Sequence, residues 1–302
     1  MGTGPSLNLV VDLRELLSYH FMLNALRAGT IVAVVAGAVG YFMVLRRQSF
    51  AGHSLAVIGF PGAAGATWLG LNAGFGYFGL CIAGALIIAT LPGAQSGLGN
   101  YGEQSAAIGT LQAFALACGF LFVSLYQGFL SDLNNLLFGS ITGVSDDQVL
   151  MLLIAGCCCL LWLAAIARPL LFSSVDPAVA RARGVRVRLL SAMFLLLLAI
   201  SVAGTSQITG SLLVFALLVA PAATASRLTA RPGLGMLASV LIAVAVTWLG
   251  EAIAFYSPYP IGFWVTTLAF AAFLLAAGYR AVTDSAGRRQ QSSATHPLAG
   301  SR

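Results

Sequence analysis

The chain has 302 residues, of which 59% are hydrophobic and 8% charged, and its formal net charge is +6. Soluble domains carry about 25% charged residues, so this composition argues against a soluble enzyme, a disordered chain and a nucleic-acid-binding protein. All fifteen basic residues are arginine. Without lysine there is no phosphate-binding loop of the G-x-x-x-x-G-K-[ST] type, and any ATP must be hydrolysed by another chain.

Long uncharged segments follow one another along the chain, and a membrane-spanning helix needs about 20 mostly apolar residues. In chain order, the candidate spans are 28–45, two passes within 48–102, then 104–131, 148–167, two short passes within 189–226, 232–250 and 258–279. The paired passes are expected to break near residues 72–76 and 204–207. The sequence therefore predicts an all-α polytopic membrane protein with eight or nine transmembrane helices, the lower number applying if one pair forms a re-entrant or broken helix.

The arginines predict the orientation, because cytoplasmic loops collect basic residues. With nine spans, one side of the membrane receives Arg46, Arg47, Arg168, Arg181, Arg183, Arg186, Arg188, Arg227, Arg231, Arg280, Arg288, Arg289 and Arg302. Asp132, Asp146 and Asp147 fall on the other side. This distribution favours nine spans, an external N-terminus and a cytoplasmic C-terminus. The chain is thus expected to comprise a lead-in (1–20), a transmembrane domain (21–280) and a cytoplasmic tail (281–302). The tail is expected to be disordered because it is polar and rich in Ser, Ala, Gly and Arg.

The largest predicted cytoplasmic loop contains a short helix signal. Asp176 followed by Pro177 is typical of an N-cap and first helical position, and Gly184 is a plausible C-cap. About two turns of helix are expected between them. Two interpretations stay open: an interfacial helix with arginines reaching toward water, or a docking helix that transmits force from a cytoplasmic partner.

Four segments in order resemble the permease subunits of ATP-binding-cassette importers for zinc, manganese and iron(II). They are 45–53 (LRRQSFAGH, leading to Phe60-Pro61-Gly62), 137–145 (LFGSITGVS), 176–185 (DPAVARARGV) and 210–225 (GSLLVFALLVAPAATA). The resemblance covers roughly residues 20–280. It implies a permease homodimer in the cell membrane, a cytoplasmic ATP-binding subunit and an extracytoplasmic metal-binding protein. It also identifies the short loop helix as the coupling helix, with Asp176, Pro177, Ala180, Arg181 and Gly184 as its coupling residues.

One position departs from the family pattern. The family commonly has an aspartate and, four residues later, a histidine, as in G-D-A-L-S-H-A, and such residues share one helix face. Here His53 stands at the aspartate position and Val57 at the histidine position. A neutral imidazole binds zinc and other borderline metals, so His53 is a candidate metal ligand. The alternative is a hydrogen bond to a neighbouring helix near the cytoplasmic end of its span.

Three further residues in the C-terminal half are candidates. Glu251 is a candidate metal ligand because carboxylates within membranes usually face a cavity or a partner; the alternative is a position among lipid headgroups. Pro221 is expected to kink its helix, and with Thr224 it is a candidate for lining the translocation path. A packing kink is the other interpretation of Pro221.

The leading interpretation is the permease of an ATP-driven importer for a divalent transition metal ion, with zinc or manganese expected. The metal would be cargo, and no cofactor is expected on this chain. A permease for an iron chelate or cobalamin is the main alternative. An ion-coupled secondary transporter would need several buried ionisable residues, of which few are found. An intramembrane enzyme is disfavoured because Ser54 and His53 are adjacent in sequence and poorly placed to pair.

Overall fold

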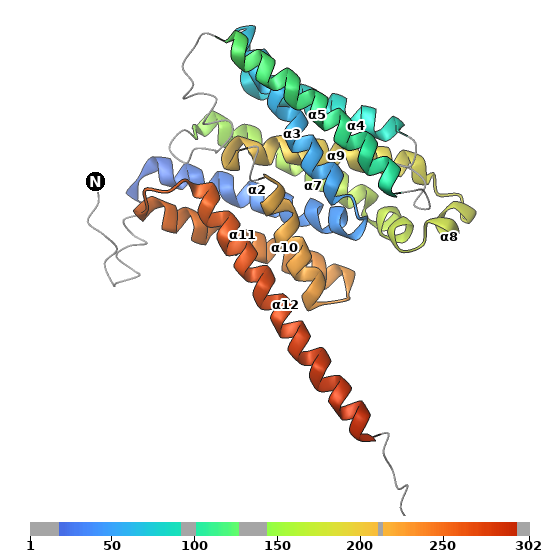
Figure 1. The fold of residues 1–302 in the computed structure, drawn as a ribbon. Coiled ribbons are helices and arrows are strands. Elements are labelled where there is room, and N and C mark those ends of the chain that lie inside the picture. The colour runs from blue at the N-terminus through green and yellow to red at the C-terminus, as the bar shows by residue number, and fades with distance from the viewer. Residues whose placement is uncertain (1–17, 92–100, 127–143, 211–213, 295–302) are drawn as a thin grey trace, which may run out of the picture.

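The computed structural model describes residues 18–91, 101–126, 144–210 and 214–294. Within these ranges the regular structure is helical, with no β-strand. The helices are α2 (His20–Leu45), α3 (Ser49–Trp68), α4 (Ala73–Thr90), α5 (Tyr101–Leu125), α7 (Asp146–Val175), α8 (Pro177–Ala182), α9 (Val187–Thr209), α10 (Val214–Leu228), α11 (Pro232–Tyr256) and α12 (Ile261–Ala294). The prediction of an all-α polytopic membrane protein is confirmed (Figure 1).

Among the described residues, a helix occupies each of the nine predicted spans. Seven of these helices are long and apolar enough to cross a membrane: α2, α4, α5, α7, α9, α11 and α12. Helix α10 has only 15 residues, and it packs against α2, α11 and α12. Helix α3 packs against α4 and α5. Neighbouring helices therefore cover much of α3 and α10, which reduces their need for long, strongly apolar sequences.

Of the two predicted breaks, one is confirmed and one is wrong. Helix α3 ends before Gly70, which has a φ of 72°, and Asn72 caps α4 by accepting a hydrogen bond from the Gly74 N–H at 2.8 Å. Helix α9, by contrast, continues through 204–207 as far as Thr209. Its polar side chains bond within the helix, as the Thr205 hydroxyl does to the Ser201 carbonyl at 2.7 Å. Such internal bonds let hydroxyl side chains sit in a helix interior.

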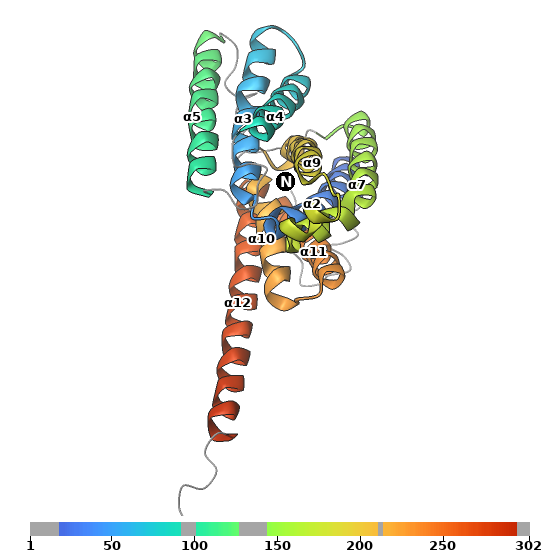
Figure 2. The same ribbon diagram turned by 90° about the vertical axis from the view of Figure 1, so that its right-hand side faces the viewer.

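The ends of the chain differ partly from the sequence expectation. Helix α12 runs to Ala294, so residues 281–294 of the predicted disordered tail are helical, and the helix projects from the bundle (Figures 1 and 2). This stretch contains no proline, and its alanine, arginine and glutamine residues are good helix formers. Residues 295–302, most of the lead-in and most of the 137–145 segment lie outside the described ranges.

Helix α2 is the centre of the bundle and packs against α7, α9, α10 and α11. Helices α3, α4 and α5 lie together on one side of it, and α10, α11 and α12 lie on the other (Figures 1 and 2). Two crossings are very close. A Cβ atom at Gly40 of α2 would clash with the Leu218 carbonyl of α10, and Gly62 of α3 and Gly76 of α4 each face the other's carbonyl oxygen. Small residues allow such close packing between helices in membranes.

Polar contacts at the two ends of the bundle agree with the predicted division of the chain between two sides of the membrane. At the external end, the Asn24 side chain donates to Asp146 at 2.8 Å, and the His20 ring lies 3.2 Å from the other Asp146 oxygen. At the cytoplasmic end, Arg280 of α12 donates to the Arg227 carbonyl of α10 at 3.1 Å. Groups that the arginine distribution assigns to one side of the membrane thus contact groups assigned to the same side.

Arg47 has a backbone conformation that favours glycine. Its φ is 57°, and it follows α2 at the position where a helix often ends with a left-handed residue. Replacing Arg47 with glycine is therefore expected to raise the free energy of unfolding by about 1 kcal/mol, because L-residues pay about 1–2 kcal/mol in the left-handed region. A thermal unfolding scan of the detergent-purified protein would show the midpoint rising by a few degrees.

The matched control for this prediction is Arg231→Gly. Arg231 is also exposed and flanks a helix, but its φ is −82°, so the exchange removes no backbone strain there. An equal rise in the unfolding midpoint of both variants would show that the loss of an arginine stabilises the protein, and not the relief of backbone strain at Arg47.

Candidate functional site

Helix α8 forms where the sequence predicts it, between α7 and α9. The Asp176 carboxylate accepts hydrogen bonds from the N–H groups of Ala178 and Val179, both at 3.0 Å. Pro177 occupies the first helical position, where its missing N–H costs nothing. Gly184 has a φ of 82° and donates its N–H to the Arg181 carbonyl at 2.9 Å. Local capping at both ends therefore explains why six residues hold a helix.

Most of α8 faces away from the bundle. Ala180 is fully buried against the neighbouring helices, whereas Val179, Arg181 and Ala182 are exposed. Figure 1 shows α8 at the edge of the molecule, beyond the ends of α7 and α9. The helix is thus attached through its two flanks and one alanine, and it presents the rest of its surface outward. Such an arrangement suits contact with another protein.

His53 lies in the second turn of α3. Its ring is half-buried and packs edge-on against the Phe215 ring of α10, with the ring centroids 5.1 Å apart. None of the hydrogen bonds among the described residues involves His53. The alternative interpretation, a hydrogen bond from His53 to a neighbouring helix, therefore gains no support. Val57, one turn further on, is also half-buried, whereas Leu55 and Ala56 between them are buried. His53 and Val57 therefore share the side of α3 that its neighbours leave partly open.

Helix α10 continues this partly open side. Phe215, Val219 and Ala223 are half-buried at spacings of four residues and so share one helix face. We call the surface formed by His53, Val57, Phe215, Val219 and Ala223 the α3–α10 face. The three α10 residues were not predicted from the sequence, although their spacing of four, beside the buried Leu218 and Ala222, is the signal that could have found them.

Pro221 and Thr224 lie inside the bundle. Both are buried, and the Thr224 hydroxyl donates to the Ala220 carbonyl of its own helix at 2.7 Å. In this conformation they are not part of the α3–α10 face. Their role in lining the translocation path stays a prediction.

Glu251 is completely buried in α11, near its external end. Both carboxylate oxygens lack a hydrogen-bond partner among the described residues. The carboxylate points at Gly29 of α2, whose missing side chain makes room for it, and Thr247 lies beside it. The position is therefore the interior of the protein rather than the headgroup region.

The structure does not bring Glu251 and His53 together. Gly29 faces Glu251, whereas Met43 of α2 packs at Gly52, next to His53. These two α2 residues are separated by 14 positions, or about 21 Å along a helix axis. Among the described residues, no group of three or more His, Cys, Asp or Glu side chains is placed to hold a metal ion. A metal role for either residue stays a prediction.

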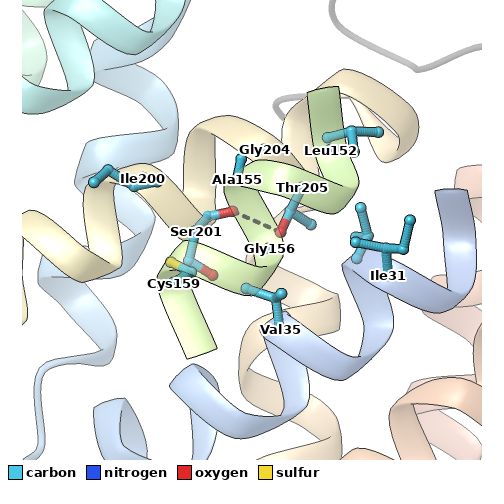
Figure 3. Close-up of a pocket in the computed structure, with 11 residues that line it drawn as sticks. Ile31, Val35, Leu152, Ala155, Gly156, Cys159, Ile200, Ser201, Gly204 and Thr205 are labelled. Carbon is cyan, nitrogen blue, oxygen red and sulfur yellow. Dashed lines mark hydrogen bonds between the residues drawn. The ribbon is translucent and has the colours of Figure 1, made fainter. Parts of the chain in front are cut away.

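A small cavity lies between α2, α7 and α9 (Figure 3). Its walls are mainly apolar and include Val35, Cys159 and Ser201, and its volume is about 20 Å³. The Ser201 hydroxyl has no partner among the described residues. This volume has room for one water molecule, which a free hydroxyl could bind. None of the candidate ligands lines this cavity.

Comparison with known proteins identifies the family. The model of the ABC 3 transport family matches residues 18–280. The chain belongs to the ABC 3 transport family. The manganese import system permease protein ScaB of Streptococcus parasanguinis is 34% identical over 233 residues, covering 74% of this chain and 80% of ScaB. The manganese transport system membrane protein MntC of Halalkalibacterium halodurans is 32% identical over 224 residues, covering 74% of this chain and 75% of MntC.

A solved structure supports the same family assignment. PsaBC from Streptococcus pneumoniae, in complex with Fab, contains a chain with a TM-score of 0.78 and 28% identity, covering 89% of this chain and 95% of that one. The resemblance inferred from four sequence segments is therefore confirmed. As a member of the ABC 3 transport family, the chain is a multi-pass transport subunit of the cell membrane.

Proposed function

We propose that this permease imports a divalent transition metal ion, with manganese as the leading substrate, and that a separate ATP-binding subunit drives it. The similarity to two manganese permeases, over about three quarters of the chain, is the observation that carries the choice of metal. In the proposed cycle, the ATP-binding subunit docks on α8, and a metal-binding protein delivers the ion at the external face. The two halves of the importer then alternate between outward and inward opening.

We further propose that two copies of the permease meet through the α3–α10 face. One chain offers a single imidazole at this face, which is too little to hold an ion firmly. In a two-fold symmetric dimer, a residue near the axis lies close to the same residue of the second copy. Two copies of His53 would then provide two nitrogen ligands for one ion. A small ligand set suits a transit site, because an ion must leave as well as enter.

Uptake by a strain lacking the chain and complemented with it tests the proposed function. Initial uptake rates of Mn(II), Zn(II), Fe(II), an iron chelate and cobalamin would be measured separately. Mn(II) uptake is expected to be restored, and only while the partner ATP-binding subunit can hydrolyse ATP. Restoration of chelate or cobalamin uptake alone would support the main alternative. Metal uptake by vesicles that contain only this chain would instead support a secondary transporter and overturn the proposal.

A further inference from the structure

Arg46 reaches into the cytoplasmic end of the bundle. It directly follows α2, and its guanidinium donates hydrogen bonds to the hydroxyls of Ser173 at 3.2 Å, Ser174 at 3.3 Å and Ser191 at 2.7 Å. The guanidinium also lies over the Phe194 ring, with the carbon at its centre 5.6 Å from the ring centroid. The planar fork of arginine suits such multi-point contact.

These four partners belong to the two helices that hold α8. Ser173 and Ser174 lie in the last turn of α7, directly before Asp176 caps α8. Ser191 and Phe194 lie in the first two turns of α9, which follows α8. Arg46 therefore contacts both flanks of α8 at once, although these flanks are 127 to 145 positions further along the chain.

The contact is between a cation and neutral groups. Burial lowers the pKa of the Arg46 guanidinium to about 10, so it keeps its charge at neutral pH. No carboxylate pairs with it among the described residues, and its Nε atom has no partner there. Removing a charge from water is costly unless it is paired. A simple contribution to stability is therefore a poor explanation for this side chain.

The backbone of Arg46 is part of the corner between α2 and α3. The corner is tight, because Arg47 and Gln48 donate their N–H groups to the Val44 and Met43 carbonyls at 3.0 and 2.9 Å. Helix α3 then begins at Ser49 and carries His53 in its second turn. A displacement of Arg46 must therefore displace the start of the helix that carries His53.

We propose that Arg46 is a positioning residue that transmits the movement of α8 to the α2–α3 corner and so to His53. This inference rests on the proposed function. When the ATP-binding subunit moves α8, the adjoining ends of α7 and α9 move with it. Arg46 is bonded to both ends and follows them. Its role is thus to connect ATP hydrolysis to the opening of the path, without contacting the metal.

The test measures ATP hydrolysis and Mn(II) uptake together, in vesicles containing the complete importer. Arg46→Ala is expected to lower the amount of metal moved per ATP by about tenfold, which lies within the range found for residues that couple two sites. Its ATP hydrolysis should stay within about twofold of wild type. Arg46→Lys keeps the positive charge but lacks the planar guanidinium. The amount of metal moved per ATP should therefore lie between those of wild type and Arg46→Ala. Arg188→Ala is the matched control, since Arg188 is an exposed arginine near the start of α9, and its ratio should equal that of wild type.

If Arg46→Ala does not accumulate in the membrane, Ser191→Ala removes the shortest of the three hydrogen bonds and should lower the same ratio. An unchanged ratio in Ser191→Ala and the available Arg46 variants would overturn the proposal. A parallel fall in hydrolysis and uptake would also overturn it, because that result describes a loss of intact protein. Absence of metal uptake by the wild-type importer would overturn the proposed function first, and this inference with it.

Discussion

Replacing Gly184 with proline is expected to lower ATP-driven metal uptake by at least about tenfold, while the chain still inserts in the membrane. Gly184 has a φ of 82° and donates its N–H to the Arg181 carbonyl. Proline fixes φ near −65° and has no N–H, so it fits neither requirement. The end of α8 would lose its cap and its direction. ATP hydrolysis by the proposed ATP-binding subunit should continue, because the substitution leaves that subunit unchanged. Uptake and hydrolysis measured on the same vesicles would show the separation.

Gly70 provides a matched control for this variant. It follows α3 at the opposite end of the bundle with a φ of 72°, and its two capping bonds run from Gly70 to Thr67 at 3.0 Å and from Leu71 to Ala66 at 2.8 Å. They match those of α8, which run from Gly184 to Arg181 at 2.9 Å and from Val185 to Ala180 at 3.0 Å. Gly70→Pro therefore does the same local damage on the external side, where no coupling contact is proposed. It should retain most of the uptake that Gly184→Pro loses. Equal losses in the two variants would indicate general destabilisation and would contradict a docking role for α8.

Replacing His53 with alanine is expected to lower the initial rate of metal uptake by at least about tenfold at limiting metal, since even indirect support of a metal ligand is typically worth 10- to 100-fold. His53 provides the only imidazole or carboxylate on the α3–α10 face. Its ring packs against Phe215 without a hydrogen bond to a described residue, so a nitrogen remains available for an ion. Membrane abundance should be unchanged, because the ring is only half-buried.

Val57→Ala separates a ligand role from a packing role. Val57 shares the partly open side of α3 with His53, and its truncation removes apolar surface without removing a ligand. Its uptake rate should stay near wild type. The double variant His53→Asp with Val57→His installs the usual family pair and should support uptake. Wild-type uptake kinetics in His53→Ala would show that His53 only packs against its neighbours, and would contradict the proposed metal site between two copies.

The elements that could be predicted from the sequence are those with local causes. Asp176, Pro177 and Gly184 act within a few residues of one another, so α8 was predictable down to its caps. The break at 204–207 was wrongly predicted, because serine and threonine resemble loop residues until their hydroxyls are seen to bond within α9. Residues 281–294 were expected to be disordered because their composition is polar, although the stretch contains no proline to stop a helix.

The candidate site was less predictable, because it depends on contacts between distant segments. The side of α10 that stays open is decided by how α2, α11 and α12 cover the rest. The three serines that bind Arg46 carry no pattern that distinguishes them from other serines in the chain. Likewise, the sequence shows two isolated candidates in His53 and Glu251, and only the packing of α2 shows how far apart they lie.

The contact between Gly62 and Gly76 has a mechanical consequence. With their backbones in contact, α3 and α4 pack closely along their length, and we expect them to tilt together. Measured from the start of α3 at Ser49, His53 lies about 6 Å along the helix axis and Trp68 about 28 Å along it. A tilt about the start of α3 would move Trp68 nearly five times as far as His53. A small displacement at one end of α3 would then become a large displacement at the other end.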